Sequence, residues 1–194
     1  MELDKAICGE DKKCLEELAE LPSFLKELDE AARRFQIQAS PGVKPLIRGV
    51  DVEAARAAAG RQVSGEFVDY LIRRALYFRY GGGEWTGRCA VCGEPATLVV
   101  LRRSDFGIYE GYKAEARCIC GSTWSYAPWK CPKCGVEGRE HFEVYILDEA
   151  KVLRCRRCGH VFGEVEDVRE EYLQTLHLKL LMIFTKIGGG KTLP

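Results

Sequence analysis

The sequence contains no asparagine and only four glutamines among its 194 residues. Depletion of these thermolabile amides is typical of proteins from thermophiles, so we expect a thermophilic source. That expectation bears on the ten cysteines of the chain. Most cytosols keep thiols reduced, whereas the cytosols of hyperthermophiles tolerate disulfides.

The chain also lacks net charge and a long apolar run. Its 29 basic residues balance 29 acidic residues, so no overall field draws it to nucleic acid or to an anionic membrane. The longest apolar stretch, residues 176–184, is interrupted by His177 and Lys179. A membrane-spanning helix needs about 20 mostly apolar residues. Residues 1–20 are charged throughout and do not resemble a secretion signal. We therefore expect a cytoplasmic protein that does not enter a membrane.

Residues 1–84 carry apolar side chains at helical spacing, which predicts a helical N-terminal region. Pro22 is expected to begin a helix, because the first helical position needs no amide hydrogen. Asp51 is expected to cap a short alanine-rich helix that ends at Gly60. The three glycines at 81–83 then end the helical region as a hinge or linker.

Residues 85–163 differ in character, because glycine and cysteine recur and the apolar runs become short and β-like. Two such runs are Thr97–Leu101 and Phe142–Leu147. Residues 164–187 return to a helical pattern. One apolar stripe on that helix comprises Val165, Val168, Tyr172, Leu176, Leu180, Ile183 and Ile187. The whole pattern predicts an α+β protein with helices at both ends.

Eight of the ten cysteines form an internal repeat of two copies. The first copy runs from Cys89 to Gly121 and the second from Cys131 to Gly159. Each copy has a cysteine pair at either end, and a glycine follows the second cysteine of every pair. The intervening residues are enough for a short β-hairpin, so each copy is expected to carry one.

Two thiolates at Cys-x-x-Cys spacing can hold one ion from a tight turn. The glycine lets the backbone fold close to the sulfurs, whose charge accepts amide hydrogens. Two such turns make a closed tetrahedral site. Sequential pairing predicts site one from Cys89, Cys92, Cys118 and Cys120, and site two from Cys131, Cys134, Cys155 and Cys158. Zinc is the default ion and iron the rival, because tetrahedral sulfur suits both. We expect two zinc or iron ions per chain.

Several alternatives stay open at this point. The inner pairs Cys118/Cys120 and Cys131/Cys134 can instead share one ion, and all eight thiols can form disulfides or lie buried. The turn Cys118-Ile119-Cys120 is one residue shorter than the others, which predicts that site one is the weaker site. Cys8 and Cys14 stand outside the repeat and are either a disulfide or free thiols.

Four thiolates leave no coordination position for water, whereas a catalytic zinc normally keeps one. No nucleophile–base pair stands out either, so we predict a binding protein and not an enzyme. His160, close after Cys158, is expected to donate a hydrogen bond near site two or to face solvent. The last helix carries more apolar residues than one packing face requires, so it is a candidate surface for a client, unless neighbouring elements bury it on several sides.

The segment Cys89–Asp167 resembles the C-terminal part of the formate dehydrogenase accessory protein (FdhE-like) family. The opening turn Cys92-Gly93-Glu94-Pro95 is similar to that of the family, and Trp124 follows the second pair at the family's spacing. The intervals in Cys131–Cys158 are also similar, and an acidic link leads into a final helix. The chain departs from the pattern at Ala90, at the short second pair and at Pro128, and its N-terminal region is shorter.

The resemblance implies two tandem rubredoxin-like (zinc-ribbon) modules behind a helical region. The predicted boundaries are a helical domain at 1–84, a first module at 85–130, a second module at 131–163, and a C-terminal helix with its tail at 164–194. The family's function implies a chaperone-like accessory protein for the catalytic subunit of a formate dehydrogenase or a related pterin-dependent oxidoreductase. A second copy of the chain is a further candidate partner.

Two other functions compete with this reading. Zinc-ribbon modules often bind nucleic acid or assist transcription, although the balanced charge and the lack of an aromatic-basic pattern argue against that role. A small iron electron carrier is the third hypothesis, but it leaves the helical residues without a purpose.

Overall fold

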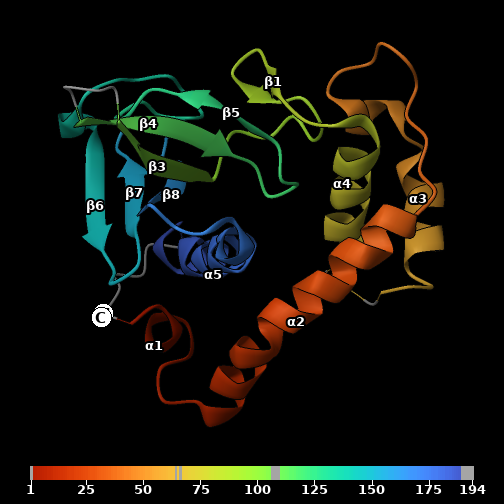
Figure 1. Cartoon of the computed structure of the whole chain (residues 1–194), viewed down its shortest axis with the longest axis horizontal. Helices are drawn as coiled ribbons and strands as arrows, with labels where there is room; N and C mark the ends of the chain where they lie inside the picture. Colours follow the sequence, from red (N-terminus) through yellow and green to blue (C-terminus); the bar gives the residue numbers. More distant parts are fainter. Residues whose placement is uncertain (1, 64, 66, 106–109, 189–194) are drawn as a thin grey trace.

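The computed structural model describes residues 2–63, 65, 67–105 and 110–188 (Figure 1). It is an α+β protein, as the sequence predicts, with helices at the N-terminal end, a mixed sheet in the middle and one helix at the C-terminal end. Figure 1 shows the sheet on one side of the molecule and helices α2, α3 and α4 on the other. Among the described residues, none of the helices has the length and apolar character needed to span a membrane.

The chain opens with α1 (Leu3–Cys8) and the long helix α2 (Lys12–Arg34). The Asp11 side chain caps α2 by accepting hydrogen bonds from the amides of Lys13 and Cys14. Cys8 and Cys14 are joined by a disulfide, which settles the question that the sequence left open. The bond ties the end of α1 to the first turn of α2.

Helix α2 continues through Pro22, so the prediction that a helix begins there is wrong. An interior proline removes one helical hydrogen bond and crowds the preceding turn. Packing offsets that cost. The residues that α2 buries against Tyr70 are Leu18, Leu21, Leu25 and Leu28.

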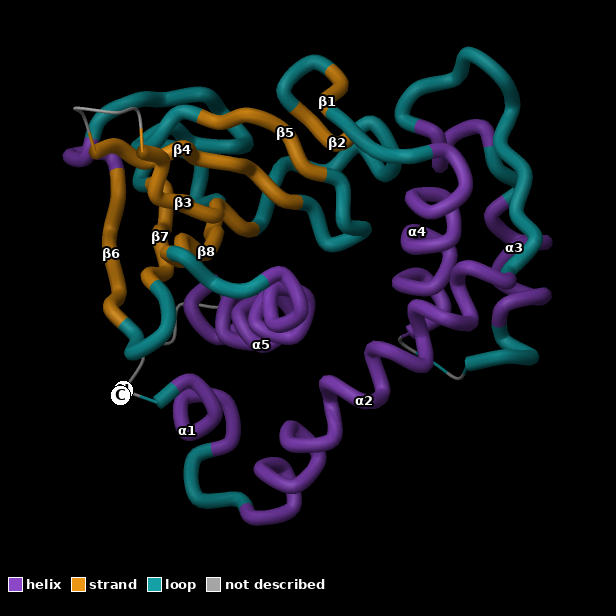
Figure 2. The backbone as a smooth tube through the Cα atoms, viewed as in Figure 1, coloured by secondary structure: helices purple, strands orange, loops and turns teal. Residues whose placement is uncertain are grey.

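Helix α3 (Val52–Ala59) begins as predicted, because the Asp51 carboxylate accepts a hydrogen bond from the Ala54 amide at 3.0 Å. A short 3-10 helix, η1 (Leu46–Gly49), precedes it. Helix α4 (Phe67–Tyr80) then packs along α2. The N-terminal helices therefore form a small bundle beside the sheet, which is visible in Figure 2.

A two-stranded hairpin and a six-stranded sheet follow α4. The hairpin comprises β1 (Glu84–Trp85) and β2 (Arg88–Cys89). The sheet comprises β3 (Leu98–Asp105), β4 (Glu110–Arg117), β5 (Thr123–Tyr126), β6 (Phe142–Ile146), β7 (Lys151–Cys155) and β8 (Val161–Glu166), with a 3-10 turn, η2 (Arg139–His141), before β6. Its strand order is β5-β4-β3-β8-β7-β6.

The sheet unites the two copies of the repeat. Each copy contains the expected hairpin, β3–β4 in the first and β6–β7 in the second. All neighbouring strands are antiparallel except β3 and β8, which pair in parallel. That parallel pairing joins the copies, so the modules share one sheet, and their predicted boundaries remain predictions.

The last helix, α5 (Glu170–Gly188), begins later than the predicted residue 164. Val165 belongs instead to β8, which is paired on both sides, with β3 and with β7. Hydrogen bonding to two strands outweighs the helical spacing of Val165 and Val168 in the sequence. Val165 still faces the apolar stripe, because it lies in the same core cluster as Leu173, Leu176 and Leu180.

Helix α5 covers one face of the sheet, and α1 packs against α5 from the side away from the sheet (Figure 1). Leu3 and Ala6 of α1 join the core between them, and Lys179 of α5 forms an ion pair with Asp4 at 2.7 Å. Most of the wide apolar surface of α5 is therefore buried. Tyr172 and Met182 are the large apolar side chains of this helix that stay exposed within the described residues.

Candidate metal centres

Site one lies where the first copy of the repeat meets the N-terminal helices. Cys89 ends β2 and Cys92 lies in the following turn, while Cys118 and Cys120 lie in the turn between β4 and β5. The four sulfur atoms lie within 4.8 Å of one another. The Sγ atoms of Cys89 and Cys120 are 3.4 Å apart, and those of Cys92 and Cys118 are 3.1 Å apart.

Site two has the same construction in the second copy. Cys131 and Cys134 lie in the turn before β6, Cys155 ends β7, and Cys158 lies in the turn before β8. Its four sulfurs also lie within 4.8 Å of one another, with cross-pair distances of 3.6 and 3.7 Å. The structure thus groups the cysteines by copy, in the sequential arrangement and not in the nested one.

Both groups fit a tetrahedral metal. Metal–sulfur bonds of about 2.3 Å place the corners of a tetrahedron about 3.8 Å apart. The distances at site two match that edge length, and those at site one are somewhat shorter. Four thiolates can hold either zinc or iron, so each group can hold one metal ion, and the donor set does not separate the two metals.

The three Cys-x-x-Cys turns share one backbone pattern. In each, the amide of the first cysteine donates to the carbonyl five residues later, and the amide of the glycine donates back to the first cysteine. The glycines Gly93, Gly135 and Gly159 have φ between 70° and 76°, in the left-handed region. Glycine occupies that region without strain, which is the physical reason for the residue after each pair.

The shorter turn Cys118-Ile119-Cys120 keeps the same pattern with one residue fewer. The Cys118 amide donates to the Ser122 carbonyl at 2.9 Å, and the Gly121 amide donates back to Cys118 at 2.9 Å. Gly121 has φ of 98°. The turn is therefore a contracted version of the others, closed by the same two hydrogen bonds, and it brings Cys120 to the rest of site one.

Backbone amides surround the sulfurs of site two. Burial disfavours the thiolate of Cys134, but hydrogen bonds from the Val136 amide and from neighbouring sulfurs bring its pKa down to about 7. The His160 amide also donates to Cys158. The His160 imidazole instead contacts the Ala96 carbonyl, 2.9 Å from Nε2, and burial lowers its pKa. Its ring is thus a structural hydrogen-bonding group and not a ligand.

Site one is buried in the core and has cationic neighbours. Its four cysteines belong to the same apolar cluster as Leu71 and Leu76 of α4. Burial alone would lower the pKa of Arg73, but the charge of Cys92 and a hydrogen bond with it raise that pKa. Arg74 donates to the Cys120 carbonyl at 2.8 Å and forms an ion pair with Asp29 of α2.

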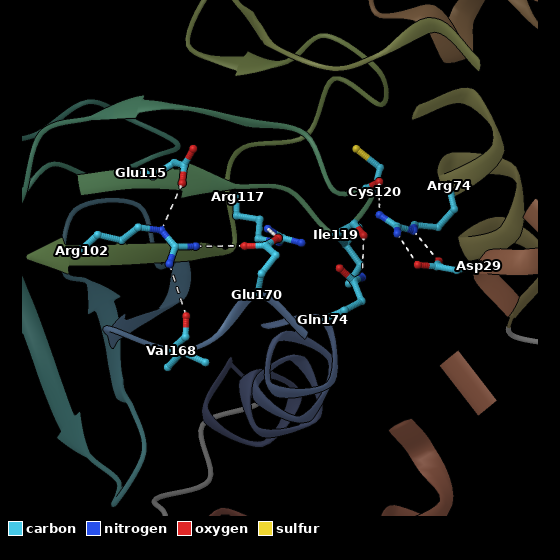
Figure 3. A network of polar contacts seen from close by, with 10 residues as sticks. All are labelled: Asp29, Arg74, Arg102, Glu115, Arg117, Ile119, Cys120, Val168, Glu170 and Gln174. Atoms are coloured by element: carbon cyan, nitrogen blue, oxygen red, sulfur yellow. Dashed lines mark hydrogen bonds and ion pairs between the residues drawn. The ribbon is translucent and has the colours of Figure 1, made fainter. Parts of the chain in front are cut away.

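Figure 3 shows how this contact continues into α5. Gln174 donates to the carbonyl of Ile119, between the two cysteines of the short turn, at 3.0 Å. Arg117, which precedes Cys118, pairs with Glu170 at 2.6 Å. The short turn of site one is therefore held by polar contacts from both α4 and α5 (Figure 3).

The sequence pattern missed these supporting residues. Arg74 lies on the apolar side of α4 beside Leu71 and Ala75, and it is 6% exposed. A cation at a buried helical position needs a buried anion or acceptor, and that requirement is the signal that could have identified it. The backbone contribution of η1 had no such signal: the amides of Leu46 and Ile47 donate to the carbonyls of the Cys-x-x-Cys turn at site one.

The structure is similar to the crystal structure of the FdhE protein from Pseudomonas aeruginosa. The two chains share 17% sequence identity, with a TM-score of 0.48, over 91% of this chain and 70% of that chain. No protein-family model and no curated protein matches the chain.

Proposed function

We propose that this chain is a metal-braced accessory protein that binds a client polypeptide and catalyses no reaction of its own. The observation that carries the proposal is the closed construction of both sites, where four cysteine sulfurs converge at each. An ion held by four thiolates has no position left for water or substrate. Its binding free energy then supports folding.

The eight cysteines are proposed as the ligands of two metal ions, zinc or iron. Their positions explain why metals would be needed. Each site ties a turn that precedes a hairpin to the turn that follows it, β3–β4 at site one and β6–β7 at site two. Short hairpins bury too little apolar surface to be stable alone. Two ions would brace the sheet into a rigid scaffold, which is what a recognition surface requires.

The proposed client is the catalytic subunit of a formate dehydrogenase or a related pterin-dependent oxidoreductase, bound in the cytoplasm before its assembly. This assignment rests on the resemblance of the cysteine spacing to the FdhE-like family. A nucleic-acid role finds less support in the surface around site two. Lys130 is paired with Glu137 at 3.0 Å and Arg154 with Glu143 at 3.6 Å, so these cations are partly neutralised for phosphate binding.

The test is to express the tagged chain together with the pterin-dependent catalytic subunit from the same source and to purify by the tag. We expect a stable complex, and about two metal ions per chain by elemental analysis. The same preparation is titrated with labelled duplex DNA and with RNA at several salt concentrations. Absence of the complex, together with tight and salt-dependent binding of nucleic acid, would replace the accessory role with the nucleic-acid role.

A further inference from the structure

Strand β6 is an edge strand of the six-stranded sheet and pairs with no strand on its outer side among the described residues. Two hydrogen bonds define which of its backbone groups face inward. The His141 carbonyl accepts from the Arg156 amide at 2.9 Å, and the Leu147 amide donates to the Ala150 carbonyl at 2.8 Å. Inward-facing residues alternate along an antiparallel strand, so the odd-numbered residues from 141 to 147 pair with β7.

The even-numbered residues of β6, which are Phe142, Val144 and Ile146, therefore direct their backbone groups away from β7. The Phe142 amide already donates to the Arg139 carbonyl, so the outward groups open to a partner are the Phe142 carbonyl and the amides and carbonyls of Val144 and Ile146. All three side chains share one face because side chains alternate along a strand. Phe142 is buried in the cluster beside site two, whereas Val144 is 40% and Ile146 68% exposed. The edge thus combines free hydrogen-bonding groups with an exposed apolar row.

Natural proteins usually protect an edge strand with charge, proline or a bulge, because an open edge pairs with other chains. Strand β6 pairs with β7 in a continuous five-residue register and contains no proline. Its one charged residue is Glu143, whose backbone groups point toward β7 and whose side chain pairs with Arg154. The residues whose backbone groups point outward, Phe142, Val144 and Ile146, carry no charge. Within the described part of the chain, the side chains of these three residues do not repel an added strand.

An acidic groove adjoins the end of this edge. It has a volume of about 740 Å³ and is lined by Ile146 together with the apolar side chains of Val168, Tyr172 and Leu176. Three of the carboxylates that line it are Glu149, Glu164 and Glu166, and two lysines line it as well. Lys151 pairs with both Glu164 and Glu166, and Lys179 pairs with Asp4, which lies outside the groove. These three carboxylates therefore outnumber the one lysine that pairs with them, and the groove suits a basic residue.

We propose that the outer edge of β6 binds an extended segment of a client polypeptide as an additional strand. Apolar side chains at alternate positions of the segment pack on Val144 and Ile146, and a basic residue at its end enters the acidic groove. Such strand addition takes affinity from backbone hydrogen bonds and specificity from alternate side chains. This edge would be the surface by which the proposed accessory protein binds its client. The identity of that client rests on the proposed function.

The test uses a fluorescein-labelled peptide of alternating valine and threonine that ends in two lysines, with a matched peptide that ends in two glutamates. Fluorescence anisotropy measures the affinity of the full chain for each. Val144→Pro removes an outward amide without removing a hydrogen bond to β7, and Val144→Lys with Ile146→Lys places charge on the same edge. Ser125→Lys, an exposed position on the opposite edge strand β5, is the control.

We expect wild type and Ser125→Lys to bind the lysine peptide equally. Both β6 variants should bind at least about tenfold more weakly, as should wild type with the glutamate peptide. Retention of both metal ions shows that a variant is folded. If Val144→Pro does not fold, the variant with Val144→Lys and Ile146→Lys provides the test. No binding by wild type, or equal binding by a folded β6 variant, would overturn the proposal. A wild-type dimer in sedimentation that the β6 variants abolish would also overturn it, in favour of a second copy.

The same variants separate this inference from the proposed function. If the pterin-dependent subunit binds wild type and the folded β6 variants equally, the docking surface is wrong and the accessory role stands. If wild type binds the lysine peptide at β6 but forms no complex with that subunit, the surface stands and the proposed client is wrong.

Discussion

The two candidate metal centres each consist of four cysteines and share one pattern of turns, but their surroundings differ. Site one is enclosed by the helices of the N-terminal bundle, and all four of its cysteines are buried. Site two lies at the rim of the sheet among aromatic side chains, and Cys134 and Cys158 are partly exposed. The same sequence motif is thus buried in the core in one copy and partly exposed at the surface in the other, according to which elements pack over it.

Electrostatics explains what the buried position requires. Four thiolates and one divalent ion carry net negative charge, which is costly to bury without compensation. At site one the compensation would come chiefly from Arg73 beside Cys92, because Arg74 is already paired with Asp29. At site two it would come from solvent and from backbone amides such as that of Val136. A charged site one would therefore depend on a residue of α4.

The largest expected effect comes from removing one site at a time. In the site-one variant, Cys92 and Cys120 are changed to Ser, and in the matched site-two variant Cys134 and Cys158 are changed to Ser. Structural metal binding contributes on the order of 10 kcal/mol, which is comparable to the whole stability of a domain. We expect the site-one variant to lose its cooperative thermal transition, monitored by circular dichroism.

The site-two variant should keep the helical signal of α2, α4 and α5, with a lower melting temperature and one metal ion per chain. Loss of the second hairpin alone accounts for that change, because the described residues that pack around site two come from strands and loops. Equal melting of the two variants would show that the difference in burial has no energetic consequence.

The order of metal release is the next test. Partial exposure gives a chelator access to site two, whereas site one must open locally first. The shorter turn of site one predicts the opposite order, but its backbone hydrogen bonds match those of the longer turns. We expect native mass spectrometry during chelation to show that site two empties first. Release from site one first, identified with the single-site variants, would restore the argument from turn length.

Arg73 tests the electrostatic part of the comparison. Arg73→Gln removes the charge beside Cys92, and changes in such supporting residues typically cost about 10- to 100-fold in metal affinity. We expect a loss in that range at site one, measured by competition with a chromophoric chelator, and no change at site two. The control is Arg157→Gln, an exposed arginine next to Cys158, which should change neither site by more than about twofold.

The smallest expected effect is the dependence of folding stability on acidic pH, to which His177 contributes. It distinguishes unfolding caused by protonation of His177 from unfolding caused by loss of metal. Burial, with a contribution from Arg117, lowers the pKa of His177 to about 3, against an ordinary value of 6.5. Between pH 6.5 and 3 the unfolded chain therefore binds a proton that the folded chain does not. Stability should fall as the pH drops below 6.5, by at most about 1.4 kcal/mol per pH unit from this group.

His177→Gln keeps a polar contact for Thr97, whose hydroxyl lies 2.6 Å from the His177 ring. Denaturant unfolding between pH 7 and 5.5, where about two metal ions should still be bound, should show a smaller dependence on pH in the variant. Identical slopes in wild type and variant would assign the acid sensitivity to the cysteines.

Local signals in the sequence predicted several features that the structure contains. The cap at Asp51, the hairpins in each copy and the grouping of cysteines by copy all follow from side-chain chemistry and spacing. Two other features needed the whole fold: α2 passes through Pro22, and Val165 lies in a strand. In both cases, contacts with segments distant in the sequence decided the outcome. The sequence left Cys8 and Cys14 open between a disulfide and free thiols, and the structure shows the disulfide.

The sequence by itself determined the candidate ligands, because two thiols and a glycine in a tight turn are a local arrangement that needs no other element. It also determined the α+β class, because helical and β-like periodicities occupy separate segments. Only the tertiary structure decided how the copies differ. The parallel pairing of β3 with β8 put both hairpins in one sheet, and the packing of α4 over the first set of cysteines buried one site and left the other at the rim. Burial and charge compensation depend on contacts between segments far apart in the chain, which no spacing pattern contains.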